Sequence, residues 1–258
     1  MYGVPVAKEA EKLQRIIAAD LHIHTCLSPC ATLDMTPKKI VTEACAKGLE
    51  IIAVTDHNSA ENTPGVIRAA TETDLYVIPG IEVTTSEEVH VLGLFEEVDQ
   101  AFAMQRIVYD NLQAGKNDED LFGIQVVANE FDEVETINTR LLIGATSLNL
   151  SEVVDTIHRQ KGLAVAAHID RERFSVIGQL GFIPDDLDLD AVEISKRLPI
   201  DQARNRFKEY KRFAFITASD AHDLKEIGTG SIHIHAVRAH IAELRQALKE
   251  TGGRRIEY

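Results

Sequence analysis

The stretch RIIAADLHIHT, residues 15–25, decides how the rest of the sequence is interpreted. An apolar run leads into Asp20 and then into two histidines separated by one residue, His22 and His24. Alternate side chains of an extended strand lie on the same face, so both imidazoles are expected to point to one side. The stretch therefore predicts a buried strand that ends in a pair of metal-ligand side chains.

Further apolar runs have the same form, because each is followed by side chains of the kind that bind metals. The runs are residues 51–54, 76–78, 164–167 and 213–218, and the side chains after them are Asp56 and His57, Glu82, His168, and Asp220 and His222. In parallel barrels the carboxyl ends of the strands meet on one face. These side chains are therefore expected to form one cluster.

Predicted helices alternate with these strands. Thr36-Pro37 is typical of the start of a helix, and Gly48 is typical of its end. Such alternation predicts an α/β fold whose parallel sheet curls into a barrel, for which ~250 residues is usual. Between about residues 96 and 146 a helix and a hairpin, with its turn at 129–132, break the alternation. We expect one domain, residues 1–258, with an inserted subdomain at 96–146.

The mixture of imidazoles and carboxylates suits Zn²⁺, Mn²⁺ or Fe²⁺. Two or three such ions a few Å apart can generate hydroxide and hold the attacking and leaving oxygens of an in-line displacement. One HxH motif is weak evidence, since His233 and His235 share the spacing and are expected on the polar face of a strand. The recurrence at successive strand ends is what predicts a centre of two or three divalent ions.

Composition narrows the partners. There are 27 basic and 41 acidic residues, a net charge of −14. An acidic surface repels the phosphate backbone, so we expect no duplex nucleic acid as partner. A small phosphorylated substrate, possibly a nucleotide, is compatible, because bound metals reverse the local potential. No run approaches the ~18 apolar residues of a membrane span, and no leader pattern is seen, which predicts a cytoplasmic protein without a membrane partner.

The chain resembles the PHP family, named for polymerase and histidinol phosphatase. The resemblance extends from Asp20 to about Gly230. It implies a distorted (β/α)₇ TIM-like barrel with a di- or trinuclear metal centre that hydrolyses phosphate esters. The motifs that carry it are Asp20-Leu21-His22-Ile23-His24-Thr25, Thr55-Asp56-His57-Asn58, Gly80-Ile81-Glu82, Glu88-Val89-His90, Ala167-His168 and Ser219-Asp220-Ala221-His222.

The resemblance also implies a ligand set. His22, His24, Glu82 and Asp220 would hold one metal, and Glu82 would bridge to a second metal held by His90 and His168. His57 and His222 would hold a third, together with an aspartate from the loop after the first strand. His90 enters only through the resemblance, because by pattern alone it is an ordinary strand residue.

The loop after the first strand departs from the family, which usually has Ser-Asp-Gly there. This chain has Ser28-Pro29-Cys30-Ala31-Thr32-Leu33-Asp34. Asp34 is predicted to supply the carboxylate from a shifted position, although alignment on Thr36-Pro37 puts Thr32 at the family's aspartate. A thiolate ligand from Cys26 or Cys30 is an alternative, and small buried thiols are the more common state of such cysteines. With Cys45, the three cysteines form no disulfide framework.

The predicted function is hydrolysis of a phosphate ester of a small metabolite or nucleotide through a metal-bound hydroxide. His57 or His222 would protonate the leaving group, and Asp20 and Asp56 would orient neighbouring imidazoles. Phosphate contacts are predicted for Arg171, Arg173 and Lys196.

Other functions are also compatible with the sequence. One is an exonuclease-type phosphodiesterase acting on oligonucleotide ends, and another is a non-catalytic, metal-binding regulatory module. A C–N hydrolase barrel can also begin with HxH, but the Ser219–His222 motif favours the PHP pattern.

Overall fold

Strand β1 (Arg15–Ile23) lies inside the sheet, with β10 antiparallel on one side and β2 parallel on the other. The computed structural model describes residues 14–257, so residues 1–13 and 258 of the predicted domain lie outside it. Within the described residues, nine strands form one sheet, in the order β11 (Arg255–Glu257), β10 (Ile232–Ala236), β1, β2 (Ile51–Val54), β3 (Tyr76–Thr84), β4 (His90–Leu94), β7 (Leu163–Ala166), β8 (Ala191–Ser195) and β9 (Ala214–Ala218).

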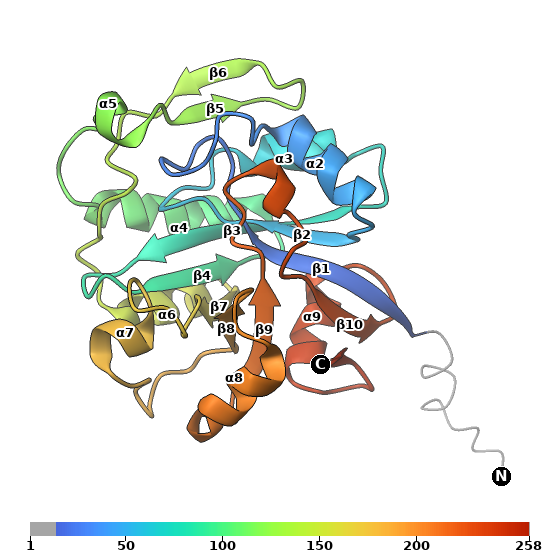
Figure 1. Ribbon diagram of the computed structural model, residues 1–258. Coiled ribbons are helices and arrows are strands. Elements are labelled where there is room, and N and C mark those ends of the chain that lie inside the picture. The colour runs from blue at the N-terminus through green and yellow to red at the C-terminus, as the bar shows by residue number, and fades with distance from the viewer. Residues whose placement is uncertain (1–13, 258) are drawn as a thin grey trace, which may run out of the picture.

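The sheet curls into a nearly closed barrel (Figure 1). Closure occurs at the carboxyl ends of the strands, where Ile23 pairs in parallel with Ala221 just after β9. The backbone N–H of His24 donates to the carbonyl of Ala221 at 3.0 Å. The predicted α/β, TIM-like barrel is therefore confirmed, and its closure brings the first and last ligand motifs together.

The expectation of a fully parallel sheet is wrong for three strands. β4 is antiparallel to both β3 and β7, and β10 and β11 are also antiparallel to their neighbours. The physical reason for β4 is the short connection at residues 85–89, which holds no helix, because a parallel return needs a crossover of a dozen or more residues.

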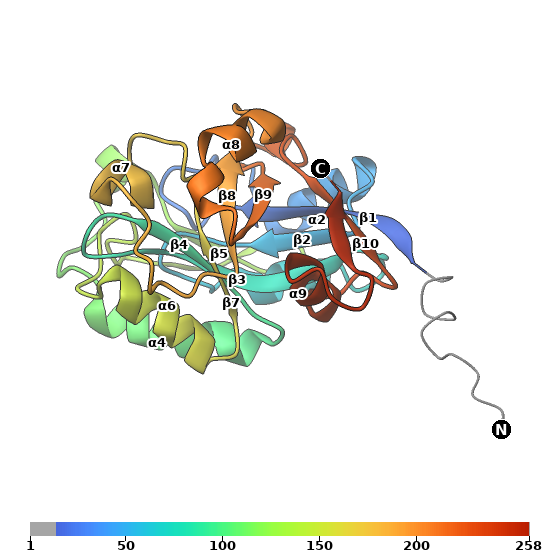
Figure 2. The ribbon, with the colours of Figure 1, turned by 90° about the horizontal axis from the view of Figure 1, so that it is seen from below.

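Helices cover the outside of the barrel, and α4 and α6 lie side by side over one part of the sheet (Figure 2). Buried residues of both helices share one apolar core with β3, β4 and β8. The longer helices are α2 (Pro37–Ala46), α3 (Thr63–Ala69), α4 (Val98–Asn111), α6 (Leu150–Arg159), α7 (Val176–Leu180), α8 (Ile200–Arg206) and α9 (Ile241–Leu248). Among the described residues, no helix is long and apolar enough to cross a membrane.

The segment 96–146 divides into two parts. Helix α4 belongs to the helix layer, because its Ala101, Met104 and Val108 are buried in the core. The short helix α5 (Glu119–Phe122) and the hairpin of β5 (Val126–Ala128) and β6 (Val134–Ile137) form a separate edge of the molecule (Figure 1). The N–H of Val126 donates to the carbonyl of Cys26 at 2.9 Å, so the hairpin supports the loop after β1.

A bulge in β1 decides which way its histidines face. Ile17, Ala19 and Leu21 alternate into the core enclosed by the sheet, which would send His22 outward. The register with β2 shifts between Asp20 and Ile23, and His22, which falls within this shift, lies inside, next to the other ligand-type side chains. β-Bulges commonly re-aim side chains beside active sites.

We predict that Gly80→Ala lowers the free energy of unfolding by about 1–3 kcal/mol. An added Cβ would lie 2.7 Å from the carbonyl oxygen of Val54 and 2.8 Å from Cγ2 of Thr55, so strand β3 must shift, and with it Glu82 two residues on. Denaturant unfolding of the two proteins measures the difference. An unchanged free energy of unfolding would show that β3 has room to move.

Candidate metal centre

The carboxylate of Glu82 lies at the centre of a cluster of imidazoles. Its Oε2 is 2.9 Å from Nδ1 of His57, and its Oε1 is 2.9 Å from Nδ1 of His90. His24 and His22 approach it within 3.3 and 3.4 Å through their Nε2 atoms. Glu82 is 1% exposed. A carboxylate so deeply buried is stable only when its charge is compensated.

The donor set fits divalent cations. Both oxygens of Glu82 and Nδ1 of His168 are buried without a hydrogen-bond partner in the described chain, despite the short contacts to nitrogen. A buried polar atom without a partner costs about 1–3 kcal/mol, a cost that a bound cation removes. Three overlapping groups have ligand atoms within 4.8 Å of one another: His22, His24 and Asp220; His57, Glu82 and His90; and His24, His57 and His222.

The charge states in the metal-free protein suit metal binding. Burial alone would raise the pKa of Glu82, but the imidazoles of His90, His22 and His57 outweigh it and hold the pKa well below its usual range. Burial lowers the pKa of His90 to about 4 and that of His222 to about 3, so both rings are neutral. The carboxylates are therefore ionised, and at least two imidazoles have free lone pairs.

His24 and His57 behave differently. Burial would lower their pKa values, but the carboxylates of Asp220 and Glu82 beside His24, and the charge of Glu82 beside His57, raise both to about 9. These rings carry the protons that balance the carboxylates when no cation is present. A cation that binds there must displace those protons.

Asp56 and Asp20, the two aspartates predicted to orient imidazoles, act on the rings through other residues. Asp56 accepts hydrogen bonds from the N–H and hydroxyl of Thr25 and from Oγ of Ser28, and Ser28 Oγ lies 2.9 Å from Nδ1 of His24. Asp56 thus orients His24 through Ser28. Asp20 faces away from the rings and accepts from the N–H groups of Ser219 and Gly228, which fixes the loop that carries Asp220 and His222.

Glu193 is a site residue that the sequence interpretation missed. Its Oε2 lies 2.8 Å from Nδ1 of His22, and both side chains are fully buried. The contact leaves Nε2 of His22 to face Glu82 and Asp220. The signal that could have revealed it is a single acidic residue in the middle of the apolar strand β8, AVEIS. Its partner is 171 positions away, so spacing gives no hint of the pairing.

Backbone strain also concentrates here. His168 and Asp220 have φ values of 29° and 48°, in the region that side chains other than glycine rarely adopt. Such conformations cost of order 1–3 kcal/mol each and persist where the surroundings hold them. Each residue lies two positions after the end of a barrel strand, and both line the cavity there.

The structure separates the predicted phosphate-binding residues. Arg171 lines the cavity beside the cluster, and its Nη2 is 2.6 Å from Oδ2 of Asp220. Arg173 is exposed and does not line this cavity. Lys196 also lies outside the lining and is paired with Glu226 at 3.1 Å.

Asp34 does not reach the cluster. Its side chain is 71% exposed and pairs with Nζ of Lys39 at 2.5 Å. The physical reason is the turn in which the N–H of Met35 donates to the carbonyl of Thr32, because Met35 is fully buried and its neighbour Asp34 faces solvent. The other predicted ligands do come together.

The cluster opens into a cavity of about 200 Å³. Its lining combines the ligand-type side chains with Cys30, Arg171, Ile143 and Phe174. The ring of Phe174 stacks on His90, with centroids 4.7 Å apart. The lining of the cavity therefore offers a cationic side chain and apolar side chains beside the ligand-type residues.

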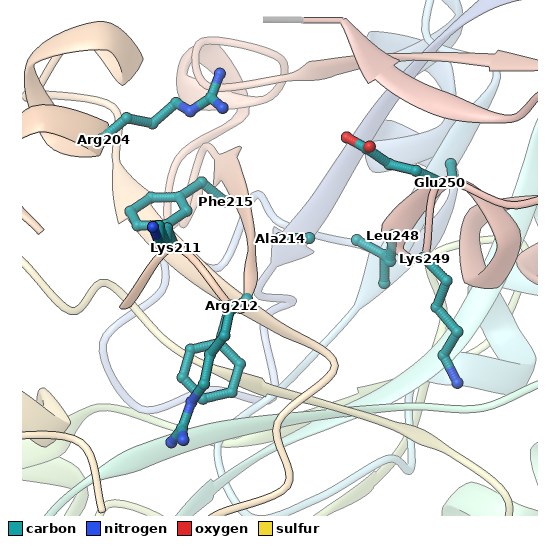
Figure 3. A pocket seen from close by; sticks show the side chains of 10 residues that line it. Arg204, Lys211, Arg212, Ala214, Phe215, Leu248, Lys249 and Glu250 are labelled. Carbon is teal, nitrogen blue, oxygen red and sulfur yellow. The ribbon is translucent and has the colours of Figure 1, made fainter. Parts of the chain in front are cut away.

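A second cavity, about 330 Å³, lies at the opposite end of β9, between the start of that strand and the end of α9 (Figure 3). Its charged side chains are Arg204, Lys211, Arg212, Lys249 and Glu250. It has no imidazole and only one carboxylate, so it is not a second metal site.

We predict that Glu193→Gln weakens divalent-metal binding by about 10–100-fold, the usual effect of losing a carboxylate that orients a metal-binding histidine. Metal binding to chelator-treated protein, measured by calorimetry, tests this. The matched control is Asp190→Asn, which removes a carboxylate 2.9 Å from Nε2 of His158, away from the cluster. Equal losses in both variants would contradict a specific role for Glu193.

The chain is similar to known proteins in sequence and in fold. The model of the PHP domain matches residues 20–213. An uncharacterized protein of Methanocaldococcus jannaschii is 26% identical over 184 residues, covering 68% of this chain and 80% of that protein. A protein of Bifidobacterium adolescentis, assigned as a metal-dependent phosphoesterase, has a TM-score of 0.55 at 19% identity, covering 79% of this chain and 87% of that one.

Endonuclease Q has a similar fold. The lesion-specific enzyme of Pyrococcus furiosus gives a TM-score of 0.71 at 19% identity over 94% of this chain. Endonuclease Q in complex with a 27-mer duplex that has an abasic lesion at the active site gives 0.67 at 20% identity over 93%. This chain spans 58% of the length of either.

The exclusion of duplex nucleic acid is therefore wrong. A protein that shares this fold over 93% of the chain binds a DNA duplex, so net charge does not settle the matter. The physical reason is that recognition depends on the potential at the site, where bound cations outweigh a distant acidic surface.

The family match over residues 20–213 agrees with the cluster of imidazoles and carboxylates at the strand ends. The chain belongs to the PHP family.

Proposed function

We propose that this chain hydrolyses a phosphate ester of a small metabolite or a nucleotide at the Glu82 cluster. The observation that carries the proposal is the buried carboxylate of Glu82, surrounded by imidazoles and without a hydrogen bond to either oxygen. An arrangement of this kind costs stability unless cations bind there. It sits at the carboxyl ends of barrel strands, where the active sites of such barrels lie.

The ligand set supports two or three ions of Zn, Mn or Fe. His22, His24 and Asp220 would hold one ion with Glu82, His90 and His168 would hold another with Glu82, and His57 and His222 belong to the third group. Bound divalent cations supply a nucleophile at neutral pH and offset charge on the phosphoryl oxygens.

The chain's own residues position the substrate. Arg171 reaches the cavity from the loop after β7, and a guanidinium can grip phosphate oxygens through two parallel hydrogen bonds. Phe174 and Ile143 offer an apolar wall on which a base or sugar can pack. A cavity of about 200 Å³ accommodates a phosphoryl group and part of its leaving group.

His57 is the better placed of the two candidate proton donors. Its pKa of about 9 keeps the ring protonated at neutral pH in the metal-free protein, whereas His222 is neutral and donates from Nδ1 to the carbonyl of Asp220 at 2.9 Å. We assign His222 to ligation and His57 to ligation or proton donation, according to whether a third ion binds.

A phosphodiesterase that acts on DNA is a second candidate. The observation in its favour is the similarity of fold to endonuclease Q over 94% of the chain. The same centre could cleave a backbone diester, since the in-line displacement is common to both reactions. The identity of 19% carries the fold only, so the substrate decides between the two candidates.

We predict chelator-sensitive release of inorganic phosphate from one class within a panel of nucleotides, nucleoside bisphosphates, sugar phosphates and histidinol phosphate, with Mn²⁺ added. His22→Ala and Asp220→Ala should abolish both metal loading and turnover, because each removes a ligand shared with Glu82. Cleavage of lesion-bearing or single-stranded oligonucleotides, with no turnover of the panel, favours the second candidate. Full activity in both variants contradicts the site.

We predict that Arg171→Ala raises KM for the phosphate substrate by about 10–100-fold, the usual value of a charge-assisted hydrogen bond. Arg173→Ala is the matched control, since the same residue type two positions on is exposed and outside the cavity. Metal content of both variants is measured alongside, because Arg171 also contacts Asp220. An unchanged KM in Arg171→Ala removes this residue from substrate binding.

A further inference from the structure

The third group of ligand atoms has no anionic member. His24, His57 and His222 bring three nitrogen atoms within 4.8 Å of one another, and no carboxylate belongs to this group. Asp34, predicted from the sequence to supply the charge, faces solvent and pairs with Lys39. A negative charge at this group would therefore have to come from another residue of the same loop.

Cys30, from the same loop, reaches the cavity beside the cluster, which Asp34 does not reach. Its Sγ lies 3.2 Å from Nε2 of His57, and it lines the cavity together with His222. Two donors at ~2.3 Å (sulfur) and ~2.0 Å (nitrogen) from one tetrahedral Zn²⁺ lie ~3–4 Å apart. The observed separation, which is that of a hydrogen bond in the metal-free chain, falls within this range.

The loop holds Cys30 against the cluster from both sides. Two positions earlier, Ser28 Oγ is bonded to Asp56 and lies 3.1 Å from the N–H of His57. Two positions later, the N–H of Thr32 donates to the carbonyl of His222 at 2.9 Å. Both anchors are tied to residues of the third group, so the backbone around Cys30 is fixed relative to its imidazoles.

A second, independent observation points to a cation in the cavity that Cys30 and Glu82 both line. Nδ1 of His57 lies 2.9 Å from Oε2 of Glu82, a buried atom without a hydrogen-bond partner among the described residues. His57 therefore stands between Glu82 on one side and Cys30 on the other. A cation bound between Nε2 of His57 and Sγ of Cys30 would therefore lie on the side of the ring away from Glu82.

Cys26, the other cysteine of the loop, has a different role. It is 1% exposed, its thiol donates to the carbonyl of Val126, and burial raises its pKa to about 12. It packs the hairpin against the loop and stays a thiol. Of the two cysteines, Cys30 alone lines the cavity.

We propose that the thiolate of Cys30 completes a third metal site with His57 and His222, in place of a carboxylate from this loop. The proposal deepens the proposed function and rests on it for the presence of metals. Thiolate is a soft ligand that favours Zn²⁺ over Mn²⁺. This chain's third site should therefore prefer Zn²⁺, whereas the site of His22, His24, Glu82 and Asp220 has only nitrogen and oxygen donors.

The test is to titrate the chelator-treated full chain with Co²⁺, which reports sulfur ligation through a thiolate-to-metal charge-transfer band in the near ultraviolet. We expect the band in the wild-type protein and its loss in Cys30→Ser, with binding at one site weakened at least about 10-fold. Cys45→Ser, a change at another exposed free cysteine, should leave the band unchanged. Asp34→Asn should leave both band and stoichiometry unchanged.

Cys30→Asp keeps the test valid if Cys30→Ser is poorly folded. It should bind as many Co²⁺ ions as wild type without the band. X-ray absorption of the Zn²⁺-loaded wild-type protein should show a Zn–S distance of ~2.3 Å that Cys30→Asp lacks. A band that persists in Cys30→Ser, or a wild-type protein saturated with Co²⁺ and lacking the band, overturns the proposal.

Phosphate release by the same wild-type preparation separates this proposal from the proposed function. Sulfur ligation without turnover of any phosphate ester supports Cys30 as a ligand and contradicts the proposed function. Chelator-sensitive turnover without sulfur ligation supports the proposed function and contradicts the role of Cys30.

Discussion

The burial of the Glu82 carboxylate is the constraint on which the rest of the structure depends. An ionised carboxylate with 1% exposure and no hydrogen bond to either oxygen is costly, and the chain surrounds it with five imidazoles within 3.6 Å. Those imidazoles come from strands and loops spread between residues 22 and 168. A barrel that closes at the carboxyl ends of its strands is the arrangement that lets them converge.

Several local features of the backbone and side chains bring these imidazoles and carboxylates together. The bulge in β1 turns His22 into the barrel, and His168 and Asp220 line the cavity from backbone positions with positive φ values. Asp56, Ser28 and Glu193 then hold the rings of His24 and His22. The strain and the buried charges cost stability in the metal-free protein, and cation binding would offset that cost.

Much of this could be predicted from the sequence, because the periodicity of apolar runs locates the strand ends. His22, His57, His168 and Asp220 were found in that way, while His90 needed the family resemblance. Three features could not be predicted in this way. Strict alternation along β1 would place Leu21 and His22 on opposite faces, so the sequence gives no sign of the bulge. Glu193 lies 171 positions from His22, so spacing does not predict their contact. Asp34 does not reach the cluster because Met35, not Asp34, fills the core. The exclusion of duplex DNA failed because net charge averages over the whole surface while binding depends on one face.

Whether Glu82 and its imidazoles hold divalent cations can be seen by anomalous diffraction from crystals of the purified protein, collected on both sides of the absorption edge of the bound metal. We expect anomalous peaks within coordinating distance, ~2.0–2.3 Å, of Glu82 and of the surrounding histidines. Crystals of a fully active protein with no anomalous peak at Glu82, or with metals bound only elsewhere, would contradict this expectation.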